Sequence, residues 1–185
     1  MSILVTGGAG YIGSHMVYAL TDAGRDVVVL DNLSTGSRGL VSEAAQFTQG
    51  NAGDIALVTN LIAHHGIDTI IHFAGSIVVP DSVADPLAYY ANNTVVARNL
   101  IEAAVKSGVK NFIFSSTATV YAGESADPLS ETLPTGPASP YGRSKLMTEW
   151  MLEDCTHAYD FRYVALRYFN GAGADGKGRT GQSSP

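Results

Sequence analysis

A glycine cluster near the amino terminus, Gly-Gly-Ala-Gly-Tyr-Ile-Gly, constrains the fold of this chain more than any other segment. It matches the pattern G-x-G-x-x-G at Gly8, Gly10 and Gly13, and it lies between an apolar stretch at residues 3–5 and helical spacing of apolar residues at 11–23. A glycine-rich turn between a strand and a helix lets the backbone approach a pyrophosphate, whose charge the helix N-terminus favours. The pattern therefore predicts a strand–turn–helix unit that binds a dinucleotide.

The rest of the chain alternates between short apolar runs and helical spacing. The apolar runs predict strands at residues 26–31, near 47, and at 67–73, 109–115 and 161–169, and the helical spacing predicts helices at 37–45, 55–65, 86–107 and 139–159. Continuous apolar strands that alternate with helices are typical of a parallel sheet covered on both faces. We expect an α/β fold with a doubly wound parallel sheet of about six strands, Rossmann-like, and functional groups at the carboxyl ends of the strands.

Composition narrows the class of protein. The chain is 45% hydrophobic and 15% charged, which allows a globular core, and its net charge of −6 argues against nucleic-acid binding. No apolar segment reaches the roughly 18 residues of a membrane span. With Cys155 as the single cysteine there is no intramolecular disulfide, and a reducing compartment fits. We expect a cytoplasmic protein that binds neither nucleic acid nor membranes.

An acidic residue follows the glycine turn at the end of the next expected strand. Asp31 lies roughly twenty residues beyond the turn, where a carboxylate can accept hydrogen bonds from the ribose hydroxyls of a dinucleotide. The same carboxylate would repel a 2′-phosphate. The sequence therefore favours NAD over NADP.

Tyr141 and Lys145 are four residues apart at the start of an expected helix and so share one face. Tyrosine has an ordinary pKa of about 10 and is a poor base at neutral pH, but a nearby ammonium and a positively charged nicotinamide would favour the phenolate. The run Ser115, Ser116 and Thr117 ends the preceding strand, where its hydroxyls would face the same crevice. These groups predict an acid–base site beside the dinucleotide, and the scattered histidines predict no metal site.

Taken together, these motifs resemble the extended short-chain dehydrogenase/reductase family, and within it the epimerases that interconvert UDP-glucose and UDP-galactose. Members of this family are much longer than this chain. The resemblance implies that residues 1–170 form the NAD-binding domain and that residues 171–185 are a loop leading to a C-terminal substrate domain that the chain lacks. The matching segments are residues 7–15, 31–36, 72–75, 115–121, 141–145 and 167–170.

The resemblance also implies the roles of individual residues. Thr117 would bind the 4-hydroxyl of the sugar, Tyr141 would take its proton while C4 gives hydride to NAD, and Lys145 would hold the nicotinamide ribose and tune Tyr141. Asn170 would touch the nucleotide sugar, and a homodimer would form through the helices at 86–107 and 139–159. The residues implied to border NAD are Gly7, Gly10, Tyr11, Ile12, Gly13, Asp31, Asn32, Thr35, Gly36, Asn51, Ala52, Phe73, Ala74, Gly75, Asn92, Ser115, Tyr141, Lys145 and Phe169.

Departures from the family pattern bear on two further interpretations. Asn51 and Ala52 stand where the family usually has an aspartate and an apolar residue that hold adenine, although an amide oxygen can still accept from the adenine amino group. Ala118 and Thr119 stand where nucleotide-sugar dehydratases carry Asp-Glu, which disfavours dehydration. A non-catalytic NAD-binding module stays open as an alternative, although it would not need the three catalytic side chains together.

Overall fold

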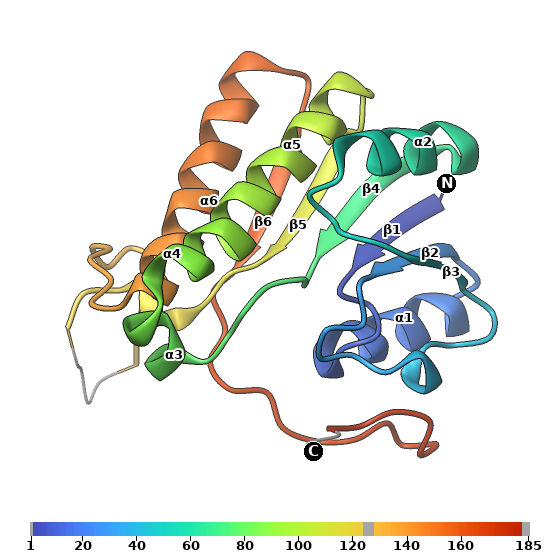
Figure 1. The fold of residues 1–185 in the computed structure, drawn as a ribbon, viewed down its shortest axis with the longest axis horizontal. Coiled ribbons are helices and arrows are strands. Elements are labelled where there is room, and N and C mark those ends of the chain that lie inside the picture. Colours follow the sequence, from blue (N-terminus) through green and yellow to red (C-terminus); the bar gives the residue numbers. More distant parts are fainter. Residues whose placement is uncertain (1, 124–127, 183–185) are drawn as a thin grey trace.

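The computed structural model describes residues 2–123 and 128–182. Within them, six strands form a parallel sheet in the order β3-β2-β1-β4-β5-β6 (Figure 1). The order reverses at β1, which pairs with β2 on one side and with β4 on the other. This confirms the doubly wound sheet, and a crevice at such a switch point is where ligands bind in this architecture. The strands are β1 (Ser2–Thr6), β2 (Asp26–Asp31), β3 (Gln46–Gln49), β4 (Ile67–His72), β5 (Asn111–Ser115) and β6 (Arg162–Leu166).

Helices cover both faces of the sheet (Figure 1). One face carries α2, α5 and α6, which bury a large apolar core that includes Leu4, Leu100 and Phe112. The other face carries α1, whose Val17 packs with Val29 and other residues in a second core. The helices are α1 (Tyr11–Asp22), η1 (Arg38–Leu40), α2 (Ile55–His65), α3 (Val79–Ala84), α4 (Pro86–Tyr89), the π-helical turn η2 (Tyr90–Val95), α5 (Val96–Lys106), η3 (Ala118–Val120) and α6 (Pro140–Ala158).

Some elements differ from the sequence-based expectation. The helix expected at residues 37–45 is wrong, because only the short 3-10 turn η1 forms there. Gly39 weakens a helix at that point, and Val41 and Ala45 bury themselves in the core beside α1 instead. The expected helix at 86–107 is continuous but contains η2, a π-helical turn of the kind that is frequent at functional sites. The short helix α3 was not expected from the pattern.

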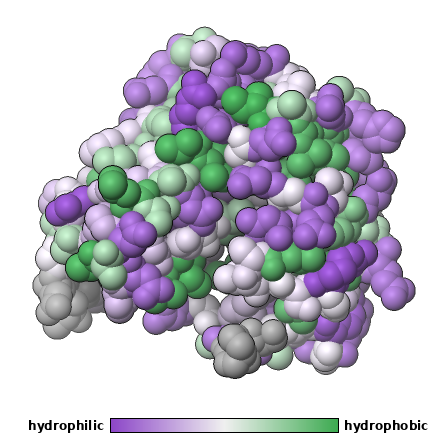
Figure 2. Space-filling view, in the orientation of Figure 1, coloured by the Kyte–Doolittle hydropathy of each residue, from purple (hydrophilic) through white to green (hydrophobic). Residues whose placement is uncertain are grey.

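None of the helices in the described residues is long and apolar enough to cross a membrane. Hydrophobic side chains nonetheless reach the surface on the face shown in Figure 2, where they lie over the helices that follow β4. Leu87 on α4, Val95 at the end of η2 and Trp150 on α6 are each more than half exposed, at 77%, 53% and 53%.

Candidate active site

The glycine turn after β1 is packed so closely that side chains do not fit in it. Gly7 has a φ of +72°, and a Cβ on it would lie 2.5 Å from the backbone nitrogen of Ala74. A Cβ on Gly13 would lie 2.1 Å from the carbonyl oxygen of Gly7. The turn therefore presses against the segment after β4 and against the first turn of α1, and its backbone is exposed to a ligand instead of being covered by side chains.

Asp31 at the end of β2 holds this turn in place. Its Oδ2 accepts a hydrogen bond from the backbone N–H of Ala9 at 2.9 Å, and its Oδ1 accepts from the N–H of Leu33 at 2.8 Å. Leu33 has a φ of 59°, a strained value for a residue with a branched side chain and one that is typical of ligand-binding loops. A carboxylate oxygen can accept more than one hydrogen bond, so Asp31 can still receive ribose hydroxyls.

The remaining residues of the segment after β2 lie beside the glycine turn. A Cβ on Gly36 would be 2.9 Å from the backbone of Ala9, which places this loop directly over the turn. Asn32 and Thr35 are exposed there and free of the core. The turn, Asp31 and this loop thus form a cradle that fits the pyrophosphate and ribose of the expected dinucleotide.

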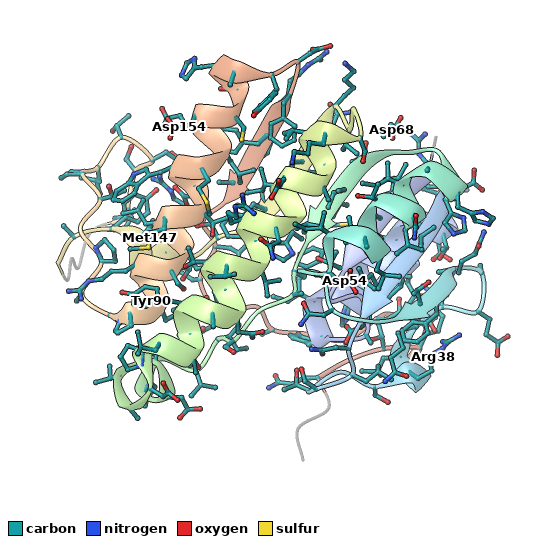
Figure 3. The ribbon with its side chains drawn as sticks, turned by 45° about the horizontal axis from the view of Figure 1, so that its top comes forward. Arg38, Asp54, Asp68, Tyr90, Met147 and Asp154 are labelled. Carbon is teal, nitrogen blue, oxygen red and sulfur yellow. The ribbon has the colours of Figure 1, made fainter. Side chains whose placement is uncertain are left out.

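Asn51 follows β3, the strand beside β2, and lies where an adenine base would extend beyond that ribose. Its Oδ1 accepts from the N–H of Gly53 at 2.7 Å, and an amide oxygen has a second lone pair with which to accept from a ligand. Ala52 is buried in the core. Asp54 caps α2 by accepting from the N–H of Leu57 at 3.0 Å and has a structural task (Figure 3). An open hollow of about 330 Å³ at this place is lined by Asn51, Gly53, Asp54, Val96 and Asn99.

The segment Phe73–Ala74–Gly75 leads from β4 to the acid–base groups. A Cβ on Gly75 would lie 2.9 Å from Oδ1 of Asn93 and 3.6 Å from Nζ of Lys145. Asn93, buried in η2, accepts from the N–H of Ser76 at 2.8 Å and donates to Oγ of Ser144 at 3.1 Å. Asn92, the residue chosen from the sequence, is exposed and donates to Oγ of Ser76 at 2.8 Å.

Lys145 and Tyr141 lie on one face of α6 and are almost fully buried. Nζ of Lys145 donates to the carbonyl oxygen of Ser115 at 3.0 Å and lies 5.0 Å from the centre of the Phe114 ring. Its distance to the centre of the Tyr141 ring is 6.0 Å. Burial lowers the pKa of Lys145 to about 8, because the apolar surroundings disfavour the ammonium.

Thr117 completes this group from the end of β5. Burial raises the pKa of Tyr141, and a hydrogen bond with Thr117 opposes that rise. Ser139 starts α6 by accepting from the N–H of Gly142 at 3.1 Å. A Cβ on Gly142 would meet the carbonyl oxygen of Thr119 at 2.7 Å, so the first turn of α6 packs tightly on the segment that carries Thr117. Local sequence thus brings the hydroxyl, the phenol and the amine together.

Other residues chosen from the sequence lie at the margin of this group. Phe169 is 69% exposed and Ile12 is 37% exposed, and Asn170 is exposed next to Phe169. Tyr11 turns its hydroxyl away to donate to the carbonyl oxygen of Gly173 at 2.7 Å. These side chains border the crevice but contact none of the three acid–base residues in the structure.

Sequence reasoning missed buried polar residues behind the site. His72, only 2% exposed, pairs through Nδ1 with Oγ1 of Thr6 at 2.7 Å, and burial lowers its pKa to about 3. Glu149 on α6 is also buried. A histidine at the end of a strand, directly after two isoleucines, and a glutamate four residues after Lys145 on the same helix face were the signals that could have found them. No cluster of three or more metal-ligating side chains occurs among the described residues.

Comparison with known proteins agrees with this geometry. A family model described as the NAD dependent epimerase/dehydratase family matches residues 3–184. A UDP-glucose 4-epimerase of Azospirillum brasilense is 51% identical over 99% of this chain and 53% of its own length. A crystal structure of UDP-glucose 4-epimerase from Brucella ovis in complex with NAD has a TM-score of 0.95 at 42% identity, covering 98% of this chain and 56% of that one.

A second solved structure extends this similarity. The UDP-glucose 4-epimerase of Bifidobacterium longum in complex with NAD+ and UDP has a TM-score of 0.92 at 39% identity, covering 98% of this chain and 57% of that one. The chain spans about half the length of the curated relatives it matches. The glycine cradle, the paired Tyr141 and Lys145, and the family match over nearly the whole sequence establish that the chain belongs to the NAD dependent epimerase/dehydratase family.

Proposed function

We propose that this chain binds NAD along the carboxyl edge of its sheet and carries the acid–base groups of a UDP-glucose 4-epimerase. The observation that carries the proposal is the buried set Thr117, Tyr141 and Lys145, of which Lys145 lies beside Gly75 in the segment after β4. A module that only bound NAD would have no use for a phenol and an amine buried together at that place, since burying them without a function costs free energy.

Residues that border the dinucleotide follow from the cradle. The pyrophosphate would lie against the backbone of Gly7, Gly10 and Gly13 and the N-terminus of α1, and the adenosine ribose would bind Asp31. The remaining residues expected from the resemblance would line this path or its rim. They are Tyr11, Ile12, Asn32, Thr35, Gly36, Asn51, Ala52, Phe73, Ala74, Asn92, Ser115 and Phe169.

The acid–base residues divide the reaction among them. When bound beside these residues, NAD would supply the reversible hydride transfer at C4 of the sugar. Thr117 would hold the 4-hydroxyl, and Tyr141 would accept its proton and later give it back. Lys145, with a pKa lowered to about 8, is mainly an ammonium at neutral pH and would stabilise the phenolate and bind the nicotinamide ribose. Asn170 would contact the nucleotide part of the substrate.

The substrate, the assembly and the compartment belong to the same proposal. A UDP-sugar as the substrate is supported by the similar structure of a UDP-glucose 4-epimerase in complex with NAD+ and UDP. A homodimer through the α4–α5 helix and α6 is supported by the exposed apolar side chains of Leu87, Val95 and Trp150. Figure 3 shows Tyr90 and Met147 on the adjoining outer faces of those helices. Residues 1–170 would form the NAD-binding unit and residues 171–185 a loop that follows it, and a single cysteine suits the cytoplasm.

Conversion of UDP-galactose to UDP-glucose by this chain, with added NAD, is the test. Tyr141→Phe removes the phenolic proton acceptor and is expected to lower the rate by a factor of about 10² to 10⁴ while the affinity for NAD stays within a few-fold. Epimerisation that survives Tyr141→Phe would reject the assigned base. NAD binding without any epimerisation would favour the alternative that the chain is a non-catalytic NAD-binding module.

A further inference from the structure

An ion pair between the buried carboxylate of Glu149 and the partly exposed guanidinium of Arg167 lies one helical turn beyond Lys145. Arg167, just after β6, donates from Nε to Oε1 and Oε2 of Glu149 at 3.1 Å each and from Nη2 to Oε2 at 2.6 Å. The hydroxyl of Ser116, just after β5, donates to Oε1 of the same carboxylate. Glu149 is only 5% exposed, and its partners satisfy both of its oxygens, as a buried carboxylate requires.

The partners of Glu149 are next to the residues that the reaction needs. Ser116 stands between Ser115, whose carbonyl oxygen receives Nζ of Lys145 at 3.0 Å, and Thr117, whose hydroxyl is bonded to Tyr141. Glu149 itself follows Lys145 by four residues on α6. The Ser116–Glu149 contact therefore joins the segment after β5 to α6. It lies one residue away from Ser115, which contacts Lys145, and one residue away from Thr117, which contacts Tyr141.

The residues after β6 support the same segment from its other side. The hydroxyl of Tyr168 pairs with that of Ser115, and the carbonyl oxygen of Tyr168 accepts from the N–H of Ala118 at 3.1 Å. The guanidinium of Arg167 lies 5.1 Å from the centre of the Tyr121 ring. The segment that carries Thr117 is therefore held to α6 through Glu149 and to the residues after β6 through Tyr168.

We propose that Glu149 is a positioning residue, which acts through the Ser116 hydroxyl to fix where the Ser115 carbonyl and the Thr117 hydroxyl lie relative to Lys145 and Tyr141. The assignment rests on the proposed function for the roles of those two side chains. If the Ser116 contact is lost, the Ser115 carbonyl moves and stabilises the ammonium of Lys145 less well, so the pKa of Lys145 falls.

Lys145 offers a direct readout, because burial already separates its pKa, about 8, from the ordinary value of 10.5. The groups that face it are Ser115 and Phe114 from β5, Tyr141 from its own helix, His72 from β4 and Gly75 after that strand. Labelling the lysine side chains with ¹³C at Cε allows the titration to be followed by NMR, and Lys145→Met identifies the signal.

Ser116→Ala is the main variant, because it removes the hydroxyl and leaves the Glu149–Arg167 pair intact. We expect the pKa of Lys145 to fall by about half a pH unit, which corresponds to the free energy of a weak net hydrogen bond. Asp160→Asn, which breaks the surface pair with Lys110, is the control and should leave Lys145 unchanged. An unchanged Lys145 titration in folded Ser116→Ala would overturn the proposal.

Glu149→Gln separates position from charge. The amide oxygen of glutamine can still accept from Ser116, so Lys145 should titrate as in the unmodified chain, whereas Glu149→Ala should resemble Ser116→Ala. A fall in the pKa of Lys145 in Glu149→Gln equal to that in Ser116→Ala would show that charge acts directly and would overturn the route through Ser116. These titrations need neither NAD nor substrate, so their failure and the failure of the epimerase assignment are distinguishable.

Discussion

The two halves of the sheet, β1 to β3 and β4 to β6, contribute different kinds of chemical group to the candidate site. On the side of β1, β2 and β3, the ligand would meet backbone groups, and the only buried charged side chain there, among the described residues, is Asp31. On the side of β4, β5 and β6, polar side chains are buried in numbers and hydrogen-bond one another. That group comprises His72, Asn93, Ser115, Ser116, Thr117, Ser144, Lys145, Thr148 and Glu149.

This difference predicts how each side fails. Where backbone binds the ligand, a site is lost when an atom is added, because a side chain displaces the turn from the pyrophosphate. Where side chains do the chemistry, a site is lost when an atom is removed, because a buried partner is left unsatisfied. The glycine turn tolerates no Cβ at Gly13, whereas the network on the other side depends on single hydroxyls such as that of Ser116.

Gly13→Ala should have the largest effect on the backbone side. The new Cβ would lie 2.1 Å from the carbonyl oxygen of Gly7, so the turn must open. We expect the affinity for NAD to fall by at least about 100-fold, since the pyrophosphate loses several backbone contacts at once. Titration with NAD, followed by calorimetry, measures this. Gly39→Ala is the matched control, because the nearest atom to its Cβ would be 3.7 Å away, and wild-type affinity in Gly13→Ala would contradict the cradle.

The buried His72 makes the stability of the half built from β4, β5 and β6 depend on pH. Its pKa is about 3 in the fold against 6.5 for an ordinary histidine, so below pH 6.5 the unfolded chain binds a proton that the folded chain refuses. Stability is therefore full above pH 6.5 and is lost as the pH falls toward 3. Between pH 6.5 and 5 this amounts to about 2 kcal/mol in the free energy of unfolding.

Urea unfolding at a series of pH values measures that slope. His72→Asn keeps a partner for Thr6 but does not titrate, so its stability should decline less between pH 6.5 and 5. His65, at the end of α2, is nearly exposed, and His65→Asn should change the slope only slightly. Equal slopes in His72→Asn and the unmodified chain would mean that His72 has the same pKa in the folded and unfolded chain, and would contradict its lowered pKa.

The same contrast explains what the sequence could predict. The glycine turn, Asp31 and the Tyr141–Lys145 pair are local patterns, in which spacing along the chain already determines which groups share a turn or a helix face. The doubly wound parallel sheet also followed from the alternation of strands and helices, whereas the order of its strands comes from the structure. The π-helical turn that buries Asn93, and the contact of Glu149 with Ser116 and Arg167, depend on three elements meeting in space, and no local spacing encodes them.

The failed helix at residues 37–45 has a related cause. Its apolar residues have helical spacing, but burying Val41 and Ala45 beside α1 stabilises the chain more than a short helix containing Gly39 would. Tertiary packing also decides Asn51. Its side chain has an oxygen of the kind that accepts from adenine, but in the structure that oxygen accepts from the N–H of Gly53.

Asn51→Asp should have the smallest effect of these variants. It changes the one position after β1, β2 or β3 where a side chain is expected to recognise the adenine base. One carboxylate oxygen can keep the Gly53 contact, and the other can accept from the 6-amino group of adenine. The affinity for NAD should rise roughly fivefold, the worth of about one hydrogen bond. Affinity for nicotinamide hypoxanthine dinucleotide, which presents a carbonyl at that place, should not rise. Asn60→Asp adds the same charge to the exposed surface of α2 and is the control. If both dinucleotides bind equally well to Asn51→Asp, the adenine base does not lie against the end of β3, and the assignment of Asn51 to the cofactor site is wrong.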